Sequence, residues 1–106
     1  MDSKAKARYE AQAKIIKAIA HPTRLFIVDE LKRQERCVCE LTEMVGVDIS
    51  TISKHLSVLK GAGIVIDDKR GTQIYYKLKV PCILDFMHCV EHVLKTNAKE
   101  HLALVL

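Results

Sequence analysis

Two cysteines, Cys37 and Cys39, stand with one residue between them at the start of a segment of helical periodicity. Side chains two positions apart diverge on a regular helix, but they converge where a helix is only beginning. A thiolate near a helix N-terminus is also favoured by the helix dipole. Because soft thiolates select soft or thiophilic ions, the pair predicts a chelate for such an ion. The alternative is that both are small core residues, since free cysteine is commonly buried.

Two further cysteines, Cys82 and Cys89, are seven residues apart, so they share one face of a predicted helix. Four thiols meeting at one point would form a tetrahedral site suited to zinc or cadmium. Three thiols would suit trivalent arsenic, which takes three sulfurs, whereas a disulfide from Cys37 or Cys39 to Cys89 would make a redox or persulfide sensor. Cys89 is also an ordinary candidate for the edge of the core. All four cysteines are therefore candidate ligands, and we expect Cys37, Cys39 and one of the other two to bind the ion.

The residues after the cysteine pair predict two short helices joined by a tight turn. The turn is 46–48, it contains a glycine, and the second helix starts at Ser50. Two short helices joined in this way form a helix-turn-helix, whose second helix enters the major groove of DNA. The apolar positions at helical spacing are Val38, Leu41, Met44 and Val45 on the first helix and Ile52, Leu56 and Leu59 on the second.

Helices are predicted on both sides of this unit. The first covers residues 4–20 and ends at His21-Pro22, because the residue before proline disfavours the helical region. Thr23 is then the expected cap of a helix over residues 24–33, followed by a polar connector over residues 34–36. A last helix is predicted over residues 82–97, with Pro81 at its first position and a break near Asn97.

Between the helix-turn-helix and the last helix, the pattern changes to that of a β-hairpin. Residues 64–66 and 73–78 are rich in β-branched and aromatic residues, and residues 67–71 form a turn signal with Lys69 and Arg70 near the tip. The predicted fold is therefore mainly α with a small β-hairpin. It is a winged helix-turn-helix with flanking dimerisation helices.

Charge is distributed as a DNA-binding surface requires. Residues 49–66 contain no acidic side chain, and carboxylates there would repel phosphates. Short polar groups and a long base at the start of the second helix are suited to base edges, although Ser50 is also a possible N-cap. A protein-interaction winged helix without DNA binding is the alternative, and the acid-free helix argues against it. The candidate DNA-binding residues are Ser50, Thr51, Ser53, Lys54, His55, Lys60, Lys69 and Arg70.

Composition limits the class of protein. The chain of 106 residues predicts a single domain, residues 1–106, with a core too small to be more than marginally stable, so we expect a homodimer. No apolar run long enough for a membrane span occurs and the N-terminus is charged, which predicts a cytoplasmic protein whose cysteines are ligands or redox sensors. Neither a Gly-rich phosphate loop nor a nucleophile elbow occurs, so we expect no enzyme and no organic cofactor.

Three segments together resemble the ArsR/SmtB family of small winged-helix repressors, which sense metals, arsenicals and thiol oxidants. They are AHPTRLFIVDEL over residues 20–31, CVCELTEMVGVDISTISKHLSVLKGAGIV over residues 37–65 and GTQIYYKL over residues 71–78. The resemblance implies a homodimer on double-stranded operator DNA that an inducer releases. The Cys37–Cys39 pair resembles the arsenic, antimony, cadmium and lead sensors, so the expected inducer is As(III), with Cd, Pb or Zn as alternatives.

The chain departs from that pattern at two places. Arsenic-sensing members often have a third cysteine three residues after the second, where this chain has Thr42. Zinc-sensing members use acids and histidines on the last helix, but the spacing differs in this chain, which has Asp85, His88, Glu91, His92 and His101. We therefore expect the third sulfur to come from Cys82 or Cys89.

Overall fold

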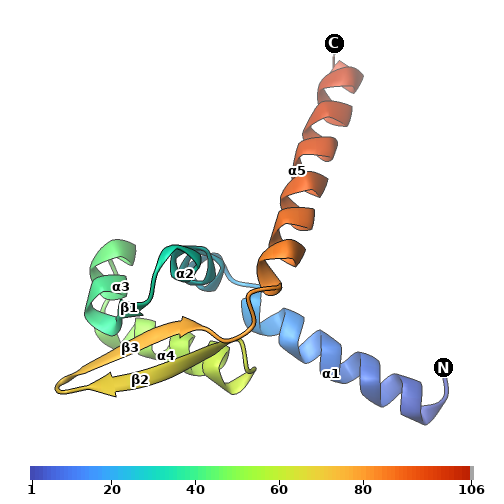
Figure 1. Ribbon diagram of the computed structural model, residues 1–106. Helices are drawn as coiled ribbons and strands as arrows, with labels where there is room; N and C mark the ends of the chain where they lie inside the picture. The colour runs from blue at the N-terminus through green and yellow to red at the C-terminus, as the bar shows by residue number, and fades with distance from the viewer. Residues whose placement is uncertain (106) are drawn as a thin grey trace.

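The computed structural model describes residues 1–105 and contains five helices and three strands within them (Figure 1). The chain starts with two helices, passes through one short strand into the helix-turn-helix, and then forms a hairpin and a long last helix. The elements are α1 (Ser3–Ile19), α2 (Pro22–Arg33), β1 (Arg36–Cys37), α3 (Val38–Val45), α4 (Ile49–Gly61), β2 (Val65–Arg70), β3 (Gln73–Leu78) and α5 (Ile83–Val105).

The helix-turn-helix forms as the apolar spacing predicts. Helix α3 ends at Gly46, whose positive φ of 81° lets the chain reverse into the turn before α4. The predicted face of α4 is completely buried and packs with residues of α2 and α3 in one aliphatic core. The fully buried large side chains are Ile27, Val28, Leu41, Ile52, Leu56, Leu59 and Val65.

Strands β2 and β3 form the hairpin, called the wing, and β1 pairs with β3, which gives an antiparallel sheet in the order β1-β3-β2. The predicted polar connector before the cysteines, residues 34–36, is therefore in part a strand. In β1, Arg36 pairs with Tyr76 and Cys37 pairs with Tyr75. A two-residue strand has no periodicity of its own, and its partner lies far away in the sequence. The consequence for function is that Cys37 is part of the sheet that carries the hairpin.

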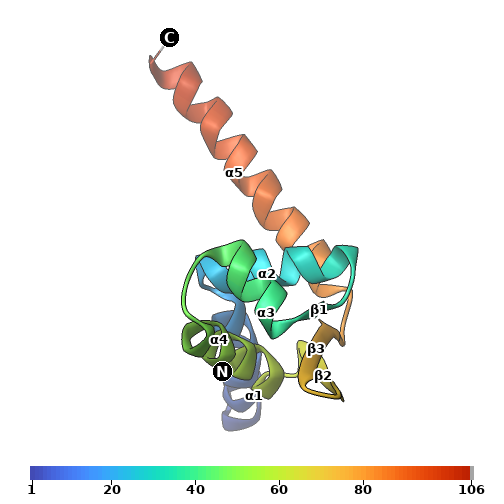
Figure 2. The same ribbon diagram turned by 90° about the vertical axis from the view of Figure 1, so that its left-hand side faces the viewer.

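Helix α5 extends away from this body in both views, and α1 does so in the first (Figures 1 and 2). On α1, Ala18 and Ile19 are buried, whereas Ile15 is 43% exposed. Helix α5 runs without a break through Asn97 to Val105, and no residue of it is buried. Among residues 1–105, no helix combines the length and the apolar character that crossing a membrane would require.

The predicted start of α2 is wrong by two residues and that of α5 by one. Helix α2 begins at Pro22 and is capped by His21, whose Nδ1 accepts a hydrogen bond from the Thr23 backbone at 3.0 Å. Thr23 is therefore inside the helix, and proline takes the first position, where its missing N–H costs nothing. The other proline, Pro81, lies with Cys82 in a turn that precedes α5.

Candidate metal centre and nucleic-acid interface

The Cys37 and Cys39 sulfur atoms lie 2.8 Å apart at the N-terminus of α3. Cys37 is the N-cap residue, and its Sγ accepts a hydrogen bond from the Glu40 backbone at 3.4 Å. The Glu40 carboxylate accepts in return from the Cys37 backbone at 3.1 Å, which completes a capping box. Cys37 is buried, whereas Cys39 is exposed. The convergence expected at a helix start is therefore present, with one inner and one outer sulfur.

Burial raises the pKa of the Cys37 thiol, and the adjacent Cys39 thiol adds to this effect. The backbone hydrogen bond from Glu40 acts in the opposite direction and is the smaller influence. The position at a helix start predicted a favoured thiolate, but loss of hydration outweighs the helix terminus here. Cys37 therefore keeps its proton at neutral pH.

An arginine clamp supports the segment before the cysteines. Arg36 contacts the buried Glu30 of α2 at 3.0 Å and Glu40 of α3 at 2.9 Å. The backbone of Cys37 and the guanidinium of Arg36 both lower the pKa of Glu40, so this carboxylate stays ionised. The spacing of four residues between Arg36 and Glu40 was visible in the sequence, but the contact with Glu30 was not.

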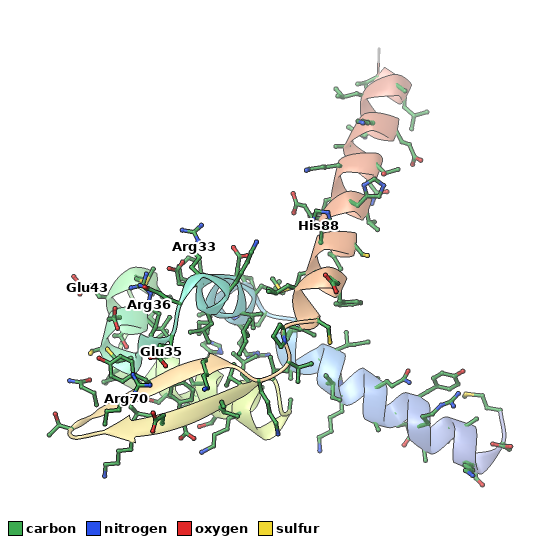
Figure 3. The ribbon with its side chains drawn as sticks, in the orientation of Figure 1. Arg33, Glu35, Arg36, Glu43, Arg70 and His88 are labelled. Carbon is green, nitrogen blue, oxygen red and sulfur yellow. The ribbon has the colours of Figure 1, made fainter. Side chains whose placement is uncertain are left out.

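The two other cysteines are not brought to this pair within one chain. Cys82 lies in the turn before α5 and Cys89 on that helix, and both are exposed. His88 also lies on α5 and is exposed (Figure 3). Within residues 1–105, no three His, Cys, Asp or Glu side chains are grouped so that they could hold a metal ion. A single chain therefore offers two soft donors, which fits part of the coordination shell of a thiophilic ion.

The first turn of α4 carries hydroxyl groups that are already engaged. Ser50 and Thr51 both donate to the Asp48 carboxylate, which lowers the pKa of Asp48. Asp48, and not Ser50, is the N-cap residue of α4. One turn further along, Ser53 and Lys54 are exposed, as a residue that contacts bases must be.

His55 has a different environment from Lys54. Its Nδ1 lies 3.1 Å from a guanidinium nitrogen of Arg24, and its ring centroid is 4.4 Å from that of His21. Burial lowers the pKa of His55, and the charges of His21 and Arg24 lower it further. The half-buried ring therefore joins α4 to the start of α2, while Lys54 is the more accessible base on α4.

The basic residues of the wing differ in how firmly they are held. Arg70 binds both oxygens of Glu35 at 2.7 and 2.9 Å and a carboxylate oxygen of Asp68 at 2.9 Å (Figure 3). Its guanidinium also lies over the ring of Tyr75, 4.6 Å from the centroid. These carboxylates raise the pKa of Arg70, and Arg70 lowers that of Glu35. To contact a phosphate, Arg70 must therefore give up its contact with the carboxylate of Glu35.

The two remaining basic candidates lie on α4 and the wing. Lys60, in the last turn of α4, forms an ion pair with Asp67 of β2 at 2.9 Å. That ion pair raises the pKa of Lys60 and joins the end of α4 to the base of the wing. Lys69 is exposed beside Arg70, on the opposite face of β2.

Relatives of the chain share both its sequence and its fold. The profile of the family described as "Bacterial regulatory protein, arsR family" matches residues 21–67. The transcriptional repressor SmtB of Mycobacterium tuberculosis is 36% identical over 69 residues, which are 65% of this chain and 51% of SmtB. The chain thus spans about half the length of that relative. The transcriptional repressor SdpR of Bacillus subtilis is 35% identical over 71 residues, 67% of this chain and 79% of SdpR.

The fold has a solved counterpart of nearly the same extent. It is the homodimeric winged helix-turn-helix DNA-binding domain of a possible ArsR-family transcriptional regulator from Mycobacterium bovis. The two structures superpose with a TM-score of 0.80 at 28% identity, over 95% of this chain and 94% of the other. The predicted winged helix-turn-helix and the predicted family are both confirmed. With this agreement of sequence and fold, the chain belongs to the ArsR family of bacterial regulatory proteins.

Proposed function

We propose that the protein is a transcriptional repressor that binds operator DNA as a homodimer and releases it when a thiophilic ion binds Cys37 and Cys39. The observation that carries this proposal is the sulfur pair, 2.8 Å apart, at the start of the first helix of the helix-turn-helix. An ion bound there acts on the element against which the DNA-reading helix packs. A movement of α3 on binding of an inducer would therefore be passed directly to α4.

The DNA-binding surface consists of α4 and the wing. Helix α4 buries one face completely, which leaves Ser53 and Lys54 exposed on the side away from the core. No carboxylate occurs between residues 49 and 66 to repel phosphates. We assign base contacts to Ser53 and Lys54 and phosphate contacts to Lys69 and Arg70. Ser50, Thr51, His55 and Lys60 then support this surface through their contacts with Asp48, Arg24 and Asp67.

A homodimer accounts for the apolar surface of the projecting helices. On α5, Val90, Val93 and Leu94 are each about half exposed, at 46%, 55% and 58%. An apolar groove of about 810 Å³ runs between α2 and the first half of α5 and includes Phe26 and Leu84 in its lining. Exposed apolar surface of this extent marks an interaction site. The homodimeric relative from Mycobacterium bovis supports the same arrangement for this chain.

Trivalent arsenic is the inducer that we favour, with three sulfurs around it. Cys37 and Cys39 supply two, and the third is assigned to Cys82 or Cys89, of the same or of the partner subunit. Zinc, which is tetrahedral with zinc–sulfur distances of about 2.3 Å, would hold two thiolates about 3.8 Å apart. The two sulfur atoms lie 2.8 Å apart here, so we expect them to separate when such an ion binds. Cadmium, lead and zinc are the other thiophilic ions that suit such donors.

The test is operator binding with and without each candidate inducer. A duplex selected from a random-sequence library serves as the operator, and a mobility-shift assay at two salt concentrations measures the affinity. We expect arsenite to weaken binding, and we expect a steep loss of affinity with salt from the phosphate contacts. Lys54→Ala should weaken binding to the selected duplex while leaving the fold intact. Unchanged affinity with arsenite, cadmium, lead and a thiol oxidant would exclude the sensor role.

The identity of the third ligand needs a separate measurement. X-ray absorption of the arsenite-loaded protein counts the As–S bonds in the wild type, Cys82→Ser, Cys89→Ser and the double variant. We expect three bonds in the wild type and two in the variant that lacks the third ligand. Three bonds in the double variant would exclude both Cys82 and Cys89.

A dithiol redox sensor is the second candidate, and the short distance between the sulfur atoms favours it. A hydroperoxide would accept two electrons and the two thiol protons as the Cys37–Cys39 disulfide forms, leaving an alcohol and water. Intact-mass measurement after peroxide treatment detects the loss of two hydrogens. Reversal by a dithiol reductant, together with no arsenite binding, would select this function over ion sensing.

A further inference from the structure

Cys39 reaches across to the tip of the wing. Its Sγ donates a hydrogen bond to Oε1 of Gln73 at 3.2 Å, across 34 positions of sequence. Gln73 is the first residue of β3 and follows the turn at Gly71 directly. The exposed sulfur of Cys39 is thus hydrogen-bonded to Gln73, at the tip of the hairpin that we expect to contact DNA.

The backbone connects the same two places. Cys37 pairs with Tyr75, two residues beyond Gln73, and side chains two apart on a strand lie on one face of the sheet. On the other strand of the hairpin, Arg70 pairs with Gln73 and binds Glu35 through its side chain. Arg70 leaves Glu35 if it contacts a phosphate. Among the side-chain hydrogen bonds of residues 1–105, the one from Cys39 to Gln73 would then remain between the wing tip and the segment that holds the cysteine pair.

We infer that Gln73 is a positioning residue that transmits the state of the Cys39 sulfur to the wing. The inference rests on the proposed sensing function of the cysteine pair. A free thiol has a hydrogen to donate to the Gln73 carbonyl oxygen. A sulfur bound to a soft ion, or bonded to the Cys37 sulfur, has lost that hydrogen. The carbonyl oxygen of Gln73 then faces a second acceptor, so the glutamine side chain must leave or turn its NH2 group toward the sulfur, and the wing tip is displaced when the sensor is loaded.

The size of the effect follows from the strength of one hydrogen bond. A thiol is a weak donor, so its hydrogen bond to a carbonyl oxygen shifts an equilibrium by about twofold to threefold. Gln73→Met replaces the carbonyl oxygen by a thioether, which is only a weak acceptor, and keeps a side chain of similar length. We expect this variant, with its thiols empty, to bind the selected duplex about twofold to threefold more weakly than the wild type. Loading with arsenite should then weaken it by a correspondingly smaller factor.

The link itself is tested without DNA and without an inducer, through amide hydrogen exchange at residues 69–74. Cys39→Ala removes the donor, whereas Cys39→Ser keeps a hydroxyl hydrogen at the same place. We expect faster exchange in Cys39→Ala and in Gln73→Met, no further increase in the double variant, and near wild-type protection in Cys39→Ser. Thr72→Ala, at the adjacent turn position, is the matched control and should leave both the exchange at residues 73–74 and the response to arsenite unchanged.

The outcomes separate this inference from the proposed function. If the wild type binds DNA identically with and without arsenite, cadmium, lead and a thiol oxidant, the sensing function fails, and the exchange experiment still decides whether the link exists. If arsenite weakens DNA binding equally in the wild type and in Gln73→Met, the sensing function stands and the role of Gln73 is wrong. Additive effects of Cys39→Ala and Gln73→Met on hydrogen exchange would also overturn it.

Discussion

Replacing Arg70 and Glu35 tests whether the wing exchanges an internal carboxylate for a DNA phosphate. Arg70 is held in two-point contact with Glu35 at 2.7 and 2.9 Å, and their side chains are 46% and 37% exposed. Water and salt reach such a pair, so it opens readily for a competing anion. We therefore expect Arg70 to leave Glu35 and contact a phosphate when the protein binds DNA.

The magnitude follows from counterion release. Each phosphate contact adds about 0.9 to the slope of log affinity against log salt, so two Arg70 residues in a dimer add about 1.8. Between about 50 and about 200 mM salt, the wild type should lose about twelvefold more affinity than Arg70→Ala does. Glu35→Gln removes the competing charge and keeps the size of the side chain. This variant should bind both selected and scrambled duplexes more tightly than the wild type.

Fluorescence anisotropy of a labelled duplex, repeated over that salt range, measures these slopes. Lys4→Ala removes one positive charge near the exposed start of α1, far from the wing, and should keep the wild-type slope. An Arg70→Ala slope equal to that of the wild type would mean that Arg70 stays with Glu35 in the complex. The exchange of partners at the wing would then be wrong.

Three further predictions concern the core and the titratable side chains. Leu56→Ala should lower the free energy of unfolding in urea by about 2–5 kcal/mol, because Leu56 is completely buried. A smaller loss would mean that the surrounding side chains fill the space left by the leucine. The pKa of His55 is lowered in the folded state, so the unfolded chain takes up a proton more readily. The contribution of His55 to the free energy of unfolding should therefore be complete above about pH 6.5 and fall as the pH drops below that value. Unfolding at about pH 7.5 and about pH 5.5 measures this fall, which should be smaller in His55→Gln. Iodoacetamide should modify the exposed Cys39 well before the buried Cys37, because the raised pKa of Cys37 keeps that thiol protonated. Peptide mass mapping over time measures the two rates, and equal rates would contradict this prediction.

The helix-turn-helix was predictable because its signals are local. Ile52, Leu56 and Leu59 recur at helical spacing, and a glycine stands where the chain must adopt a positive φ, so neither feature depends on distant residues. Helix α5 was predicted too short, because one asparagine costs a helix less than about 1 kcal/mol and does not end it. The strand β1 was missed because two residues carry no alternation, and because its partners Tyr75 and Tyr76 are identified only by tertiary structure.

In the candidate site too, the features with a local signal could be predicted from the sequence, and those that depend on tertiary contacts could not. The spacing of Cys37 and Cys39 predicted their convergence, and the 2.8 Å distance between their sulfur atoms agrees with it. The residues that surround the pair come from other parts of the chain: Glu30 through the arginine clamp and Gln73 through its hydrogen bond to Cys39. Neither residue belongs to a motif, and each acquires its role only because β1 places the cysteines between α2 and the hairpin. The assignment of Cys82 and Cys89 as ligands stays a prediction.

The way in which the two cysteines are held indicates which part of the DNA-binding surface an inducer moves first. Cys37 is fixed on three sides, by its pairing with Tyr75, by its capping box with Glu40 and by its burial. Cys39 is exposed and holds one side-chain partner besides Cys37, namely Gln73. If an ion binds and the sulfur atoms move apart, we expect Cys39 to be displaced, and with it the hydrogen bond to Gln73 of the wing. Helix α4 is held by a fully buried apolar face, so we expect the wing to respond before the reading helix does.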